Sequence, residues 1–380
     1  MTNNSPLLPS TSPEKVHSSP QSAKRPSLSR ACLGIFITTG VSLLLYGVMR
    51  LSPSFSDGFN RSISQFLRTL FARLTAWIPF SLAEAMVLFL PVFLVLVLTH
   101  AIRNRSGSWR SVGVYFLELL SVACVFLILF IWMFAAGYNG RTIDAPEKLD
   151  LRQVEPTAEQ LADVARTLVE HINEESANVH FRYHDFSAMP YTLDELNRKL
   201  TAAYETFCAQ KSWIETFPCR VKPVMSSDLW SYTHITGVYT FFTGEANINT
   251  VFPDYSIPYT AAHELAHQRG ISREDEANFV AFLVCIGSDD AYIRYSGYLS
   301  LYEFVADALY QYDSDLYREV KQTLSIDVRY EMYAYSCFFD KYRDSTVGTI
   351  SGAVNDATIK IQGSRDYDAV VDLVVAYYNK

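Results

Sequence analysis

Charged residues are scarce in this chain of 380 residues. Asp, Glu, Lys and Arg make up 19% of the sequence, against 49% hydrophobic residues, and the mean hydropathy is +0.06. That value is high for a purely soluble protein and low for a polytopic carrier, which argues against both classes. The sequence also has no internal repeat. The balance predicts a few membrane spans attached to a water-soluble domain.

Large apolar residues are few in residues 1–30. This segment is rich in Ser and Pro and carries Lys15, Lys24, Arg25 and Arg30. Such a composition cannot bury enough surface to offset the entropy lost on ordering, which excludes a packed core there. The segment is also too long and too polar to be the front of a simple cleaved signal peptide. We expect residues 1–30 to form a disordered cytoplasmic tail.

Polar interruptions are nearly missing from three later stretches, Ala31–Met49, Ala83–Ile102 and Val112–Ala135. Each is long enough to cross a hydrocarbon core of about 30 Å. The carboxylates within them are Glu84, at one end, and Glu118, near the start of the third. Three such stretches in series disfavour the alternative of buried core helices. The sequence therefore predicts a membrane domain over residues 31–135 with three transmembrane helices.

The positive charges indicate how these helices are oriented. The N-terminal tail is basic, and the loop after the second stretch carries Arg103, Arg105 and Arg110. Basic segments stay on the cytoplasmic side, which predicts a cytoplasmic N-terminus. Four Arg between the first two stretches, in an expected amphipathic interfacial helix, weaken this signal without reversing it. We expect a multi-pass protein of the cell membrane whose residues from about 136 onward are extracytoplasmic.

Positive charge is in short supply in that outer part. Residues 136–380 contain 21 Lys and Arg against 36 Asp and Glu, a balance of −15. An acidic surface of this kind argues against nucleic acid as a partner. Cys208 and Cys219 are the closest pair of cysteines in the outer part. An extracytoplasmic location permits a disulfide between them, and free buried thiols are an equal alternative.

Local signals divide the outer part further. Residues 136–156 are interpreted as a linker that leaves the membrane. Thr157 with Gln160 has the spacing of a capping box, and so has Thr192 with Glu195. Each pair precedes apolar residues at helical spacing, so each predicts the start of a helix.

The remaining pattern defines the fold class. The run Thr236–Asn249 is rich in Val, Tyr, Thr and Phe, with Gly237 and Gly244 as punctuation, and is interpreted as strand. From Tyr259 onward the pattern is mainly helical. We therefore predict an α+β protein, in which three transmembrane helices precede a helix-rich extracytoplasmic domain over residues 157–380 with a small β-sheet.

One motif carries chemistry, His263-Glu264-Leu265-Ala266-His267. On a helix, two histidines four residues apart share a face, so both imidazoles can reach one tetrahedral zinc ion. Glu264, beside the first histidine, can then accept a proton from water at the metal. Gly270 is a natural C-cap, which predicts that the helix ends one turn past the metal. The motif is short enough to arise by chance, and two surface histidines on a helix are the alternative.

The residues that follow offer a third ligand. Glu274 and Asn278 are one turn apart, as expected for a metal-binding Glu and an Asn that orients a ligand histidine through a hydrogen bond. Glu276 is the alternative ligand, but it lies about 200° around the helix from Glu274, so only one of them can face the metal. We favour Glu274 and expect Glu276 to point towards solvent or Arg273. A metzincin would need a third His where this sequence has Arg273.

The run before the motif has a possible role in substrate binding. Zincins bind a peptide as an added strand on the edge of a small sheet above the metal helix. Residues 238–249 precede the motif at a workable distance for such an edge. An ordinary core strand is an equally good interpretation.

These residues together resemble a known family. Phe242-Thr243-Gly244-Glu245-Ala246-Asn247, the His263–His267 motif and Glu274-x-Glu276-Ala277-Asn278 are similar to a bacterial family known only as a domain of unknown function, DUF3810. The C-terminal segments 354–360, 366–368 and 371–373 share this likeness, which runs from the first span to the C-terminus. The resemblance implies a membrane-anchored bacterial zincin and supplies no substrate. The Glu-x-x-Ala-Asn pattern is also similar to other gluzincin-like families, which favours Glu274 over Glu276.

The function predicted from the sequence is that of a zinc metalloendopeptidase. Zn²⁺ is the expected cofactor, and a peptide or protein of the envelope or membrane is the expected substrate. The alternative is a non-catalytic membrane scaffold with a structural or vestigial zinc site. Glu264 favours the enzyme, because a structural site needs no base and usually has closed, Cys-rich coordination.

Overall fold

The computed structural model describes residues 28–103, 109–152, 155–183, 186–209, 211–214, 216–218, 220–342 and 368–380. Four predictions concern residues outside these ranges. They are the disordered tail, except for its last residues, the basic loop around Arg105, the pairing of Cys208 with Cys219, and most of the C-terminal likeness to the family.

The described residues form helices and a small sheet. The membrane-side helices are α1 (Arg30–Leu51), α2 (Pro53–Phe59), the π-helix η1 (Asn60–Ser64), α3 (Gln65–Ala76), α4 (Leu82–Arg103), α5 (Trp109–Phe130), the π-helix η2 (Ile131–Ala135) and α6 (Ala136–Asn139). The later elements are α7 (Ala158–Ser176), α8 (Leu193–Cys208), β1 (Val221–Pro223), α9 (Ser227–Ser231), β2 (Gly237–Thr240), β3 (Glu245–Ile248), α10 (Ser256–Gln268), α11 (Glu274–Ile286), α12 (Ala291–Tyr312), α13 (Ser314–Gln322), α14 (Ile326–Asp340) and α16 (Asp368–Tyr378).

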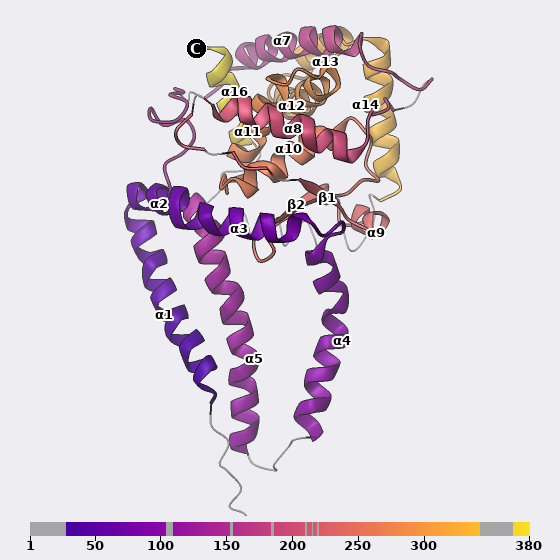
Figure 1. Ribbon diagram of the computed structural model, residues 1–380. Coiled ribbons are helices and arrows are strands. Elements are labelled where there is room, and N and C mark those ends of the chain that lie inside the picture. The colour runs from indigo at the N-terminus through magenta and orange to yellow at the C-terminus, as the bar shows by residue number, and fades with distance from the viewer. Residues whose placement is uncertain are drawn as a thin grey trace, which may run out of the picture.

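Three helices are long and apolar enough to cross a membrane, at Arg30–Leu51, Leu82–His100 and Val112–Asn139. They agree with the three predicted spans to within a few residues and indicate a membrane protein. The third includes α5, η2 and α6 without a break. The first packs along it, and Trp132 Nε1 donates a hydrogen bond to Ser42 Oγ at 2.8 Å. Figure 1 shows the three helices standing below the rest of the molecule.

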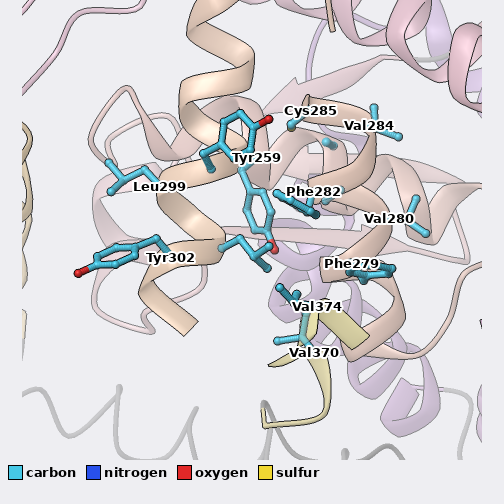
Figure 2. Packing of buried hydrophobic residues seen from close by; sticks show 14 of the residues in the cluster. Tyr259, Phe279, Val280, Phe282, Val284, Cys285, Leu299, Tyr302, Val370 and Val374 are labelled. Atoms are coloured by element: carbon cyan, nitrogen blue, oxygen red, sulfur yellow. The ribbon is translucent and has the colours of Figure 1, made fainter. Parts of the chain in front are cut away.

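The outer domain is built around α10, α11 and α12. Phe279 and Phe282 of α11 are fully buried, and Tyr259 of α10 packs with them (Figure 2). Val370 and Val374 of the C-terminal helix α16 close this core from the side of α11. The core thus joins the metal-motif helix to the last residues of the chain.

Both predicted capping boxes are confirmed. Thr157 Oγ1 accepts from the backbone N–H of Gln160 at 3.2 Å, and α7 begins at the next residue after Thr157. Thr192 Oγ1 accepts from the backbone N–H of Glu195 at 3.3 Å at the start of α8. In each case the side chain of the fourth residue accepts in return from the backbone N–H of the Thr, which satisfies two donors at the helix start.

The predicted strand over Thr236–Asn249 is instead two strands. Gly244 has a φ of +71° and turns the chain, so that β2 and β3 pair as an antiparallel hairpin. A left-handed φ is one that glycine adopts readily, and it lets the chain reverse within four residues. The sheet has the order β1-β3-β2, with β1 parallel to β3. The strand β2 therefore has no strand partner on its other side among the described residues.

The segment interpreted as a linker is packed. Its first four residues are α6, which extends the third membrane helix. Ile143 is 1% exposed and Leu151 is 8% exposed, and both belong to the core of the outer domain. Apolar residues in a segment of this kind are buried when the neighbouring elements offer a surface, and α11 does so here: the backbone N–H of Ile143 donates to Glu276 Oε1 at 3.0 Å.

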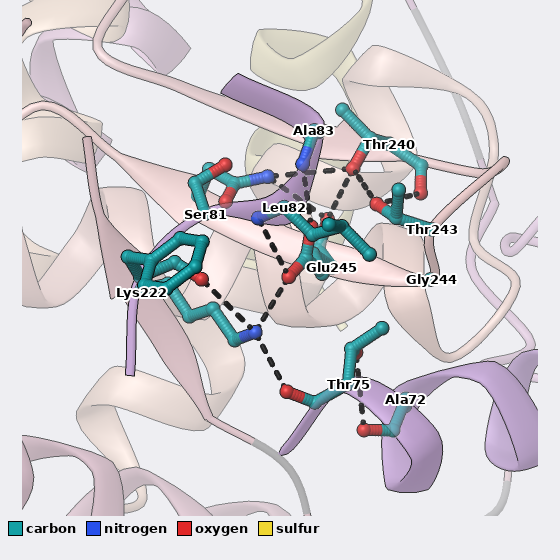
Figure 3. A network of polar contacts seen from close by, with 12 residues as sticks. Ala72, Thr75, Ser81, Leu82, Ala83, Lys222, Thr240, Thr243, Gly244 and Glu245 are labelled. Atoms are coloured by element: carbon teal, nitrogen blue, oxygen red, sulfur yellow. Dashed lines mark hydrogen bonds and ion pairs between the residues drawn. The ribbon is translucent and has the colours of Figure 1, made fainter. Parts of the chain in front are cut away.

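A buried ion pair ties the sheet to the membrane helices. Lys222 of β1 and Glu245 of β3 lie 2.5 Å apart, with their side chains 2% and 0% exposed. Lys222 Nζ also donates to the carbonyl of Thr75, in the last turn of α3, at 2.7 Å (Figure 3). Glu245 accepts from the backbone N–H groups of Leu82 and Ala83 at 3.1 and 2.9 Å, which caps the start of α4. The pair thus links two strands to the residues on either side of the turn between α3 and α4.

Replacing Lys222 by Met is expected to lower the free energy of unfolding by about 3–5 kcal/mol, because the Glu245 carboxylate stays buried without its cation. The double replacement Lys222→Met with Glu245→Gln removes both charges and is expected to recover part of the loss. Denaturant unfolding of the full chain in detergent measures both. A single variant as stable as the parent would contradict the prediction.

Candidate metal centre

The motif helix α10 is held on every side but one. Ala261, Ala262, Leu265 and Ala266 are fully buried, so the helix backbone lies close to its neighbours. The hydroxyl of Tyr204 on α8 donates to the carbonyl of Ala262 at 2.5 Å. The alanines let neighbouring elements come close to the helix backbone, and the two histidines project from a different face.

The predicted helix stop at Gly270 is confirmed, although the C-cap itself is Arg269 and α10 ends at Gln268, sooner than expected. Gly270 has a φ of +93°, and its N–H donates to the carbonyl of His267 at 2.9 Å. The N–H of Ile271 donates to the carbonyl of Ala266 at 3.2 Å, so the helix ends in a tight reversal. A Cβ at Gly270 would lie 2.3 Å from the guanidinium of Arg68, so the position has no room for a side chain.

This reversal places the first residue of α11 opposite the histidines. Glu274 Oε2 lies 3.2 Å from His263 Nε2 and 3.5 Å from His267 Nε2. A tetrahedral zinc ion with bonds of about 2.05 Å would separate its ligand atoms by about 3.3 Å. Within the described ranges, these three residues are the one group of three or more such side chains whose ligand atoms lie within 4.8 Å of one another. The donor set and its spacing fit zinc.

The alternative ligand lies elsewhere. Glu276 accepts from the backbone N–H of Ile143 and lies 3.7 Å from Arg273 Nε, as the predicted contact with Arg273 requires. Of the two expected surroundings, solvent and Arg273, the structure has the second, and Glu276 is 4% exposed. Glu276 and Arg68 both line a polar cavity beyond the end of α10. Neither His263 nor His267 lines this cavity. Burial raises the pKa of Glu276 to about 7.

The partner predicted for a ligand imidazole is not Asn278. The Asn278 side chain contacts Tyr259 instead. The hydroxyl of Tyr259 lies 3.1 Å from the backbone carbonyl of Asn278 and 3.4 Å from its side-chain oxygen, and it donates to both. His267 Nδ1 lies instead 2.7 Å from the carbonyl of Ile271. A carbonyl can only accept, so Nδ1 donates to it and Nε2 is the nitrogen that would bind a metal. A backbone carbonyl gives no side-chain signal, which is why the sequence does not reveal it.

Electrostatic attraction couples Glu274 to the two histidines. Burial alone lowers the pKa of His267, but the Glu274 carboxylate outweighs it and raises this pKa to about 9. Burial also opposes ionisation of Glu274, yet His267 and His263 hold its pKa well below the usual range. An ionised carboxylate thus lies beside the protonated His267, and a divalent cation bound there would displace a proton from this imidazole.

Glu264 is placed for proton transfer. Burial raises its pKa to about 7, against smaller opposing effects from the imidazoles of His263 and His267. Its Oε2 has no hydrogen-bond partner among the described residues. Gly237 of β2 packs directly on it, because a Cβ there would lie 2.6 Å from Glu264 Oε1. A general base works best when its pKa lies near the working pH, and burial provides that here.

One neighbour of the centre comes from the third membrane helix. The ring of Phe134 in η2 meets the ring of His267 edge to face, with centroids 5.8 Å apart. Phe134 also packs on Tyr239 of β2, at 5.6 Å. The sequence reveals no such contact, because Phe134 is one apolar residue among many in a predicted span.

The fold and the site define a membrane protein with a helix-rich domain beyond its membrane helices, in which two histidines and a glutamate converge beside a buried glutamate. A family model described as "Protein of unknown function (DUF3810)" matches residues 55–375, and the chain belongs to this family. That description names no activity. No curated protein and no solved structure matches the chain.

Proposed function

We propose that this protein is a membrane-anchored zinc metallopeptidase of the gluzincin type that hydrolyses peptide bonds of an envelope or membrane protein. One observation carries the proposal. The Nε2 atoms of His263 and His267 lie 3.2 and 3.5 Å from one carboxylate oxygen of Glu274, the spacing of ligands around a tetrahedral ion. The buried Glu264 beside them favours a catalytic over a structural site.

Each residue has one role in the proposed reaction. His263, His267 and Glu274 would hold Zn²⁺, which supplies a Lewis acid for the scissile carbonyl when bound. Glu264 accepts the proton of the attacking water and donates it to the leaving amine. The carbonyl of Ile271 fixes the ring orientation of His267 throughout. Gly237 leaves no side chain between β2 and Glu264, so a peptide lying along β2 passes close to the base.

Metal analysis and cleavage assays on the full chain in detergent test the proposal. We expect about one zinc per chain, and we expect His263→Ala and His267→Ala to abolish its binding, because each removes one of three ligands. Digestion of a peptide library by the parent protein, analysed by mass spectrometry, tests the activity. Zinc binding without any cleavage would favour the alternative of a non-catalytic scaffold with a structural site. Native protein that contains no metal would remove the basis of the proposal.

The proposal includes an extracytoplasmic site, which follows from the basic tail and the Arg residues after the second span. A topology reporter fused after Gly140 is therefore expected to report an extracytoplasmic location. A reporter inserted in the loop between the second and third spans is expected to report the cytoplasm. The opposite pattern would place the site in the cytosol.

A further inference from the structure

The metal centre is fixed to the end of the third membrane helix. The carbonyl of Phe134 accepts from Ser272 Oγ at 2.8 Å, and the carbonyl of Tyr138 accepts from Arg273 at 2.9 Å. Gly137 lies between these contacts, and a Cβ there would lie 2.1 Å from Ser272 Oγ. The turn from α10 to α11, which sets the positions of two ligands, thus packs on the last helical turns of the span without an intervening linker.

Helix length gives the depth of this contact. The third membrane helix runs for 28 residues, from Val112 to Asn139. A hydrocarbon core of about 30 Å takes up about 20 of them at about 1.5 Å per residue. Counted from Val112, the first residue of the span, the far surface falls at about residue 132. Phe134, which touches His267, therefore lies within about one turn of the hydrocarbon.

The start of the second span independently indicates where the same membrane surface lies. Glu245, the first residue of β3, caps the first turn of α4 through Leu82 and Ala83 (Figure 3). Since α4 begins its apolar stretch there, the sheet beside the metal helix also lies at the membrane surface. Two elements that flank α10 are thus each held directly on a membrane helix.

The helix α3 marks the surface itself. Phe66, Leu70, Leu74 and Trp77 follow helical spacing and are 66%, 40%, 58% and 79% exposed, while Arg68 on the other face is 1% exposed. In Figure 1 this helix lies across the top of the membrane helices and beneath the outer domain. An apolar stripe with a Trp at its end is typical of a helix that lies in the interface of a bilayer.

The β2–β3 turn reaches deeper into the bilayer than α3 does. Phe241 and Phe242 pack against Phe130 and Phe126 of α5, with ring centroids 5.5 and 5.3 Å apart. Phe126 lies about six residues inside the level estimated for the far surface, so this turn enters the hydrocarbon. The strand β2, whose other edge has no strand partner in the described part of the chain, therefore runs from Glu264 towards the bilayer.

From this arrangement we infer that the substrate is a transmembrane protein, cleaved in the few residues that connect its own membrane helix to its outer part. The inference rests on the proposed peptidase function and names its substrate class. A peptide added to the free edge of β2 continues along the strand into the bilayer, as the first residues outside a transmembrane helix do. A soluble polypeptide would have to bring its polar backbone down to the hydrocarbon surface, which is unfavourable.

Positional cleavage in vesicles tests the inference. The zinc-loaded full chain is reconstituted in phosphatidylethanolamine–phosphatidylglycerol vesicles with single-span reporter proteins. Each reporter carries a randomised window of about eight residues, starting either about three or about thirty residues outside its span, and the same window is also supplied as a soluble peptide. We expect the near window to be cleaved at least about tenfold faster than the other two, and Glu264→Gln to cleave none.

The outcomes separate the inference from the function on which it rests. Equal cleavage of near, far and soluble windows would overturn the inference and leave the peptidase proposal standing. Cleavage of no window by the zinc-loaded chain would overturn both. Cleavage that persists in Glu264→Gln would show a mechanism other than the proposed one.

The depth of the β2–β3 turn in the bilayer can also be measured without an activity assay. Phe242→Trp adds a fluorophore at the β2–β3 turn, and Tyr333→Trp adds one at an exposed position of α14, where Tyr333 is 69% exposed. In vesicles of lipids brominated in the middle of the acyl chain, we expect the fluorescence added by Phe242→Trp to be quenched and that added by Tyr333→Trp to be unchanged. Absence of quenching of the fluorescence added by Phe242→Trp would place the turn in water and overturn the inference.

Discussion

Replacing Glu264 by Gln is expected to leave zinc binding intact and to lower kcat/KM by about a thousandfold. The amide keeps the shape of the side chain against Gly237 but cannot accept a proton. General-base catalysis is typically worth about 10²–10⁴-fold, and Glu264 is the buried carboxylate next to the ligand set. Zinc content and peptide cleavage, measured on the same preparation, check both halves of the prediction.

A second buried glutamate provides the matched control. Burial also raises the pKa of Glu303 to about 7, and its Oε1 accepts from the hydroxyl of Tyr255 at 3.0 Å, away from the metal centre. Glu303→Gln is expected to keep both zinc and activity. If Glu264→Gln retained more than about a tenth of the parent kcat/KM, Glu264 would not be the base.

The second large effect concerns the third ligand. Glu274→Gln is expected to weaken zinc binding by more than the roughly 10–100-fold that the loss of an outer partner costs, because a neutral amide is a far poorer ligand than a carboxylate. Its Oε2 is the atom nearest both imidazoles. Competition with a fluorescent zinc chelator measures the affinity.

Glu276→Gln is the matched control for this prediction. The amide oxygen can still accept from the backbone N–H of Ile143, so the local structure is expected to persist. Since burial raises the pKa of Glu276 to about 7, a neutral side chain also suits this position. Glu276→Gln is therefore expected to bind zinc as the parent does. Loss of zinc from this variant and its retention in Glu274→Gln would reverse the assignment.

The parts of the structure that follow from local sequence were predictable. The capping boxes at Thr157 and Thr192 set helix starts within a few residues, and the three spans follow from unbroken apolar runs. His263, His267 and Glu274 lie within twelve consecutive residues, so one helix end and one tight turn determine their approach. The sequence therefore brings Glu274 close to the two histidines without knowledge of the wider fold.

The parts that depend on distant contacts were not predictable. The hairpin at Gly244 was interpreted as one strand, because the pairing of β2 with β3 is a tertiary property of a short β-rich run. The burial of Ile143 depends on the surface that α11 offers to it. The hydrogen bond from His267 to Ile271 involves a backbone carbonyl, which every residue has, so residue types alone cannot point to it.

The ion pair of Lys222 and Glu245 bears on how this protein can be divided for study. A fragment that starts after the third span would keep both charges but lose the Thr75 carbonyl and the two N–H groups of α4 that now complete the pair. It would also lose Phe134, whose ring now packs on Tyr239 and His267. The chain from the first span onward is therefore a single folding unit, and detergent or lipid is part of the solvent in which its outer domain attains its native form.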